Sequence, residues 1–391
     1  MKDALHLALR YLAHYRGRSL VLVLSLALLL FVPIGLRLLI SRSAEALSAR
    51  AAASPLLVGA KGSSVDLVLR ALYFEGRAPE PIPWSEVERV QDSGHALAIP
   101  LHVRFRAGRL PLVGTTLDYF GFRGLEVARG GQLIRLGDCV LGARAADRLG
   151  LGPGDAVVTS PETVFDVAGV YPLELRVRGV LAPSGGPDDE AVFCAIETAW
   201  VVEGIGHGHE DLATSPTGVL KREGDTITGN ASVQEFRRIT PDNIDSFHFH
   251  GDRAGFPVTA VLAVPPDARA SALLQGRYQG PDEARQIVVP AKVLDELLST
   301  VFTVEGFVTL ALGLVGLATL LTAALVFVLS LRLRARELAT MRDIGASPAR
   351  IRMLLLCEVG YLVLGAATIA ALLLALTGGL LDGLLRRTLF G

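Results

Sequence analysis

Apolar residues along this chain gather in three long runs, and most charged residues lie between or beside them. The runs cover residues 20–40, 301–331 and 353–381. A helix of about 20 apolar residues crosses a hydrocarbon core roughly 30 Å thick. The pattern therefore predicts a membrane protein whose α-helical transmembrane bundle contains three spans. For residues 20–40 a cleaved signal peptide is the alternative, but the apolar region of such a peptide runs only about 7–15 residues.

Residues 41–300 differ from the three runs because their polar and apolar positions alternate over short distances. Such segments predict β-strands at 96–105, 156–159, 164–170, 175–181, 191–196, 258–264 and 286–289. Turn-forming glycine and proline clusters separate several of them. We expect a large α/β (α+β) domain outside the cytoplasm.

Helix signals are also present in this region. Ser85 and Glu88 form a capping-box pattern, and Thr240-Pro241 is a second helix start. The alanine-rich segment 42–53 and the segment 290–298, which begins with proline, are expected as stalk helices where the chain leaves and re-enters the membrane.

Composition excludes several classes of protein. A hydrophobic share of 51% and a mean hydropathy of +0.44 exceed the globular range. The formal net charge of −1 lacks the basic excess of a nucleic-acid binder. Of the three cysteines, at most Cys139 and Cys194 could pair, because Cys357 lies in an apolar run. No phosphate-binding GxxxxGK[ST] motif or catalytic motif is present, so we expect a non-catalytic subunit with no directly bound cofactor.

Basic residues predict the orientation of the spans. Lys2, Arg10, Arg16 and Arg18 precede the first span, and six arginines lie in the link 332–352, at positions 332, 334, 336, 342, 350 and 352. Lysine and arginine in short flanking segments mark the cytoplasmic side. We therefore expect residues 1–19 and 332–352 in the cytoplasm and 41–300 outside. Arg386 and Arg387 would also be outside, contrary to this rule.

The link carries the most specific sequence motif. Residues 336–347 read RELATMRDIGAS and resemble the signature of FtsX-like ABC-transporter permeases, including MacB-type and LolC/E-type subunits. Residues 140–155 and 177–181 look like parts of the MacB-type periplasmic core domain. The resemblance covers most of the chain in order. It implies a MacB-like core domain at 41–300 and an FtsX-like permease domain at 301–391.

The resemblance also implies partners, a location and a mechanism. Such a multi-pass permease lies in the bacterial inner (plasma) membrane, pairs with a second permease subunit as a homodimer or heterodimer, and works with a cytoplasmic ABC ATPase dimer. It transmits ATP-driven motion to its periplasmic domain, a mode of action called mechanotransmission. The ATPase-coupling residues are expected to be Arg336, Glu337, Met341, Arg342, Asp343, Ile344, Gly345, Ala346 and Ser347.

The chemistry of the link fits a docking role. Met341 and Ile344 would supply apolar contacts in a groove of the partner, and the flanking charges would set the register. Gly345 can end the helix in a left-handed conformation, and Pro348 prevents simple continuation. The alternative is an ordinary cytoplasmic loop whose arginines only enforce topology.

One departure from the family concerns the number of spans. These permeases usually have four, whereas the tail 382–391 is too short for another helix. A truncated chain and a three-span variant remain open.

Histidines supply a second candidate site. Residues 207–209 read HGH, and residues 248–250 read HFH. Side chains at i and i+2 share one face of a strand, so His207, His209, His248 and His250 are candidate ligands for zinc or copper. Acidic residues lie nearby at Glu210, Asp211 and Asp252. The alternative is two exposed polar loops that never meet.

These features favour a permease that exports or extracts a lipoprotein, lipid, peptide or drug-like cargo. One alternative is a non-transporting signal transmitter that activates a periplasmic or lipoprotein partner. Another is a metal-linked (zinc) component of a transport system.

Overall fold

The computed structural model describes residues 2–161, 172–208, 219–223, 226–229 and 237–388. The chain divides into two compact units. We call Met1–Ala46 together with Leu298–Leu389 the helical unit, and Leu47–Leu297 the sheet unit. The fold class predicted from the sequence is confirmed, because long apolar helices are combined with a mixed α/β domain. The segment 164–170, where one strand was predicted, lies outside the described residues.

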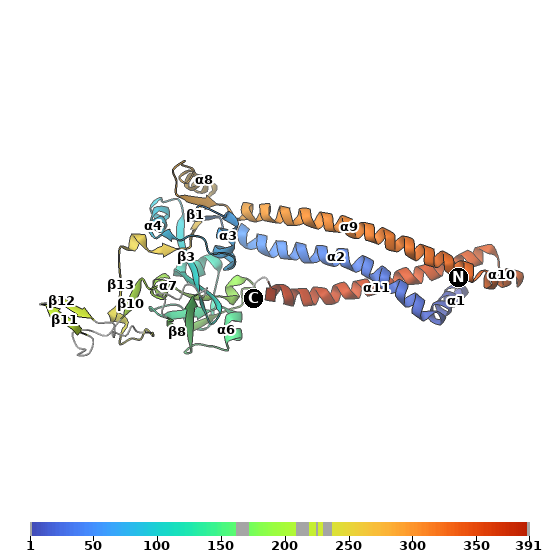
Figure 1. Ribbon diagram of the computed structural model, residues 1–391, viewed down its shortest axis with the longest axis horizontal. Coiled ribbons are helices and arrows are strands. Elements are labelled where there is room, and N and C mark those ends of the chain that lie inside the picture. The colour runs from blue at the N-terminus through green and yellow to red at the C-terminus, as the bar shows by residue number, and fades with distance from the viewer. Residues whose placement is uncertain (1, 162–171, 209–218, 224–225, 230–236, 389–391) are drawn as a thin grey trace. The chain divides into compact units, whose positions relative to one another are not determined.

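Among the described residues, three helices are long and apolar enough to cross a membrane. They are α2 (Arg16–Ala52), α9 (Pro290–Leu333) and α11 (Pro348–Thr388), and they contain the predicted spans (Figure 1). The predicted stalks 42–53 and 290–298 are not separate helices, because α2 and α9 continue through them without a break. Pro33 is accommodated inside α2.

Small residues let the helices of this unit approach one another. Gly35 of α2 lies against Leu374 of α11, and Gly365 of α11 lies against Val23 of α2. A Cβ at Gly316 of α9 would come within 2.8 Å of the Leu29 side chain. Close approach through small residues is typical of helices packed in a membrane. The amphipathic α1 (Lys2–His14) packs against α11, and α10 (Ala335–Asp343) connects α9 to α11.

The described strands of the sheet unit include ten that form one sheet, in the order β16-β1-β15-β3-β4-β9-β6-β8-β5, with β7 pairing with β3 and β8. The pairs β4–β9 and β6–β8 are parallel, and the other pairs are antiparallel. Their bounds are β1 Leu56–Ala60, β3 Leu97–Ala107, β4 Leu110–Thr115, β5 Val127–Gly130, β6 Asp138–Leu141, β7 Ala156–Pro161, β8 Glu174–Leu181, β9 Val192–Ala195, β15 Ala260–Val264 and β16 Arg285–Val288.

Shorter elements complete this unit. Two-stranded pairs are formed by β2 (Ile82–Pro83) with β14 (Pro257–Val258), β10 (Gly206–Gly208) with β13 (Phe247–Phe249), and β11 (Val219–Glu223) with β12 (Thr226–Gly229). The α-helices are α3 Ser64–Tyr73, α4 Ser85–Asp92, α5 Leu117–Arg123, α6 Ala143–Leu149, α7 Ile196–Val202 and α8 Ala268–Gly276, and the 3₁₀ turns are η2 Pro187–Glu190, η3 Ile244–Ser246 and η4 Arg253–Gly255.

Of the two predicted helix starts, the one at Ser85 was wrong, and the one at Thr240 begins only a short helical turn. The N-cap of α4 is Trp84 and not Ser85, and no side chain caps it; the Trp84 indole instead donates to Glu88 Oε1 at 3.1 Å. At Thr240 the Asn243 side chain accepts from the Thr240 amide, which closes a local turn that leads to η3. At α4 the Trp84 indole thus contacts the Glu88 carboxylate, which in a capping box would accept from the amide of the N-cap residue.

The ends of α2 and α9 belong to the core of the sheet unit. Ala51 of α2 and both Val293 and Leu294 of α9 are buried in the same apolar cluster as α3 and α5. Cys139 and Cys194 lie directly opposite each other on β6 and β9 as buried free thiols. The C-terminal end of α2 and the N-terminal end of α9 are therefore part of the sheet unit.

Candidate functional site

The predicted coupling segment folds as a separate helix between two spans. Just beyond the C-terminal end of α10, the Ala346 amide donates to the Met341 carbonyl and the Gly345 amide donates to the Arg342 carbonyl, both at 2.9 Å. Gly345 has a φ of +97°. These two bonds form a Schellman end, in which a left-handed glycine is favoured. The helix stop expected from Gly345 is therefore present, and α11 begins at Pro348.

Most of the expected coupling residues are exposed in the described part of the chain. Arg336, Arg342 and Asp343 are exposed, and Ile344 is 79% exposed although it is apolar. Met341 is half-buried. The arrangement leaves an apolar side chain and several charges available to a partner at one end of α10.

Arg334, which the sequence did not single out, holds this helix in place. Its Nη1 lies 3.0 Å from both carboxylate oxygens of Glu358 on α11, and its Nε lies 3.3 Å from Glu337 Oε2. The guanidinium also lies 3.3 Å from the centre of the Tyr11 ring on α1. Arg334 and Glu358 are only 5% and 2% exposed. Glu337 thus has a partner within the chain, and α10 is tied to both α1 and α11.

A second buried ion pair lies in the sheet unit, at the end of α2. Arg50 binds Asp188 of η2 in a two-pronged pair, with distances of 2.6 Å and 2.9 Å. The Tyr119 hydroxyl donates to Asp188 Oδ1 at 2.7 Å, and Arg50 Nε donates to the Leu72 carbonyl. Burial alone would raise the pKa of Asp188, but the Arg50 charge and the hydrogen bonds from Arg50 and Tyr119 hold this pKa below its usual value.

The structure brings together three of the four histidines predicted as metal ligands. His207, His248 and His250 place their candidate ligand atoms within 4.8 Å of one another. His209, Glu210 and Asp211 lie outside the described residues, and Asp252 instead caps η4 by accepting from the Ala254 amide. The alternative of two loops that never meet is wrong for the HFH segment and His207.

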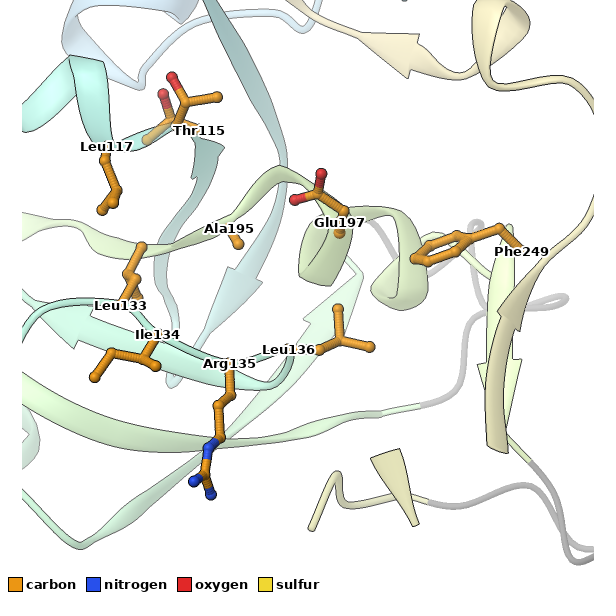
Figure 2. Close-up of a pocket in the computed structure, with 10 residues that line it drawn as sticks. Thr115, Leu117, Leu133, Ile134, Arg135, Leu136, Ala195, Glu197 and Phe249 are labelled. Atoms are coloured by element: carbon orange, nitrogen blue, oxygen red, sulfur yellow. The ribbon is translucent and has the colours of Figure 1, made fainter. Parts of the chain in front are cut away.

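A pocket of about 500 Å³ lies in the sheet unit beside the strand pair β10–β13, whose Phe249 is one of its lining residues. Figure 2 shows Phe249 on one side and the segment with Leu133, Ile134 and Leu136 on another, with Glu197 between the two. The walls are mostly apolar, which is typical of sites for small ligands. This pocket could not be predicted from the sequence, because its lining comes from segments far apart along the chain.

Comparison with known proteins gave similarity at the level of structure only. No family model and no curated protein matches this sequence. The periplasmic region of MacB from Actinobacillus actinomycetemcomitans aligns with a TM-score of 0.33 and 11% identity, over 62% of this chain and 92% of that one. The extracellular domain of the noncanonic ABC-type transporter YknZ from Gram-positive bacteria gives 0.32 and 12%, over 60% and 98%. A domain of a putative permease protein from Porphyromonas gingivalis gives 0.26 and 12%, over 60% and 85%.

Proposed function

We propose that this chain is a permease subunit of an ABC-type transport system and that a separate cytoplasmic ATPase docks on α10. The observation that carries the proposal is the link itself. A short helix with the FtsX-like motif lies between two candidate spans and is held by the buried Arg334–Glu358 pair. Because Arg334 fixes the start of α10 to Glu358 of α11, displacement of α10 by a bound partner would also displace the spans. A loop without such contacts could change conformation without moving the spans.

The other end of the pathway is the anchorage of α2 and α9. Both helices run unbroken from apolar, span-length segments into the core of the sheet unit. Two polar contacts also hold the C-terminal end of α2: Arg50 forms an ion pair with Asp188 of η2, and the Leu47 carbonyl accepts a hydrogen bond from the Tyr73 hydroxyl of α3. In this proposal, movement of these helices reaches the sheet and need not open a pore through the membrane.

In this proposal the protein lies in the bacterial inner membrane with α10 inside and the sheet unit outside. A second permease subunit, identical or related, completes the pair that an ATPase dimer requires. The apolar pocket in Figure 2 offers a surface for an apolar part of the cargo, whether lipoprotein, lipid, peptide or drug-like molecule.

Purification of the tagged full-length chain from its native membranes in mild detergent tests this function. We expect a P-loop ATPase to co-purify in stoichiometric amount and to hydrolyse ATP in the complex. The matched control is a chain in which residues 335–347 are replaced by a glycine-serine linker of equal length, and it should recover no ATPase. Recovery of the wild-type chain without any ATPase, or equal recovery with the control, would refute the proposal.

A further inference from the structure

The pair of strands β10 and β13 has two chemically different faces. The pairing sets His207 opposite His248, and His250 lies two residues beyond His248 on the same face. The three ring centroids are 4.8–4.9 Å apart. Three imidazoles are thus gathered on one side of this strand pair, although His207 and His248 are 41 positions apart in the chain (248 − 207).

The other face of the strand pair is apolar and anchors it. Phe249 packs against Trp200 and Phe256, with ring centroids 6.4 Å and 6.0 Å away, and Phe247 packs on a buried apolar cluster. The glycines opposite these rings are required, because a Cβ at Gly206 or Gly208 would lie within 2.7 Å of a phenylalanine ring. The alternation in GHG and FHF therefore directs the histidines away from the core.

The nitrogens of this cluster are suited to a metal ion. His248 Nδ1 lies 3.0 Å from the Ser246 carbonyl oxygen, which can only accept, so the tautomer with its proton on Nδ1 makes this hydrogen bond and keeps Nε2 as the ligand nitrogen. A backbone carbonyl that orients a histidine in this way is typical of metal ligands. In a tetrahedral zinc site with Zn–N near 2.1 Å, ligand nitrogens are about 3.4 Å apart. Nitrogens already within 4.8 Å reach that spacing by small side-chain rotations.

We propose that His207, His248 and His250 bind one Zn²⁺ ion. Imidazole suits zinc and other late divalent metals, whereas Mg²⁺ and Ca²⁺ require oxygen ligands and Cu⁺ favours sulfur. The inference goes beyond the proposed transport function and does not depend on it.

The location of the site gives metal binding a structural consequence. Phe249 lies between His248 and His250 in the sequence and also lines the pocket in Figure 2. Coordination of one ion by the three histidines would restrict the motion of the strand pair β10–β13. Phe249, which lines the pocket, would then be restricted as well. Because Phe249 contacts Trp200, Zn²⁺ should also change the tryptophan fluorescence of the sheet unit.

Zinc titration of the full-length chain tests the site. The protein is purified in detergent through a tag without histidines, stripped with a chelator and titrated with Zn²⁺ by calorimetry. We expect one Zn²⁺ per chain. The double variant His248→Gln/His250→Gln should weaken binding at least about 100-fold, since loss of an outer-shell partner alone costs about 10–100-fold. His207→Gln should weaken it at least about 10-fold.

The matched control is His95→Gln, which removes an imidazole two residues before β3 and should leave zinc affinity unchanged. Unchanged thermal unfolding of each variant, followed by tryptophan fluorescence, shows that the fold survives. Co²⁺ bound in place of Zn²⁺ should give the intense visible absorption of four-coordinate cobalt, and the double variant should lose it. The absence of stoichiometric zinc, or zinc binding that survives the double substitution, would overturn the proposal.

Discussion

Replacement of Asp188 by asparagine is expected to destabilise the sheet unit by about 3–5 kcal/mol. The substitution keeps the size of the side chain but leaves the guanidinium of Arg50 buried without its counter-charge. Arg123 makes the loss worse, because its charge lies near the same cluster and stacks over the Tyr119 ring at 5.8 Å. A buried charge that has lost its partner carries the full cost of removal from water.

The effect of this substitution should depend on pH in a defined direction. The pKa of Asp188 is lowered in the folded chain, so the carboxylate stabilises the fold fully above the unfolded pKa of about 3.9. That stabilisation is lost as the pH falls through the lower folded pKa. The difference between wild type and Asp188→Asn should thus be constant near neutral pH and shrink only in strong acid.

Tryptophan fluorescence measures this stability in the full chain. Both tryptophans of the sequence, Trp84 and Trp200, lie in the sheet unit, where their rings are 5.2 Å apart. Their unfolding signal therefore reports on this unit alone. Asp92→Asn, at an exposed position in α4, is the matched control and should change stability by less than about 0.5 kcal/mol. Equal unfolding of the two variants would mean that the Arg50–Asp188 pair does not fix the end of α2.

Replacement of Ile344 by glutamate should abolish the coupling of ATP hydrolysis to this chain. Ile344 is 79% exposed at the end of α10, next to a glycine that fixes the direction of the chain. If it fills an apolar pocket of the ATPase, a carboxylate there loses the contact and is buried without a partner. Central apolar anchors of interfaces contribute about 2 kcal/mol or more, so binding should weaken at least about 30-fold.

The matched control for this variant is Ala349→Glu. It adds the same charge at an exposed position in the first turn of α11, where an acidic side chain is favourable for the helix dipole. ATPase binding to the chain in lipid nanodiscs should be lost in Ile344→Glu and kept in Ala349→Glu. Equal binding by both variants would place the docking surface elsewhere.

The parts of the fold that depend on local pattern could be predicted from the sequence. The spans within α2, α9 and α11, and strands such as β3 and β8, follow from uninterrupted or alternating apolar residues. The strands β1, β4 and β6 were missed because they are buried along all or nearly all of their length, so no alternation marks them. The capping box at Ser85 failed because Trp84 starts the helix one residue earlier.

The contacts that hold the sites could not be predicted, because they join distant residues. Arg50 and Asp188 are 138 positions apart, and no periodicity connects them. Arg334 looked like one of several basic residues of the link, although the lone Glu358 in an apolar run was a sign that a buried cation lies nearby. The histidines were the exception, since their spacing placed two of them on one face before any pairing was known.

We place the docking surface for an ATPase on α10. Photo-cross-linking in living cells tests this claim most directly. A photoreactive amino acid replaces Ile344 in one full-length chain and the exposed Lys61 of the sheet unit in another. We expect capture of a P-loop ATPase from position 344 and not from position 61. Capture of no ATPase from position 344, or capture from position 61, would contradict the claim.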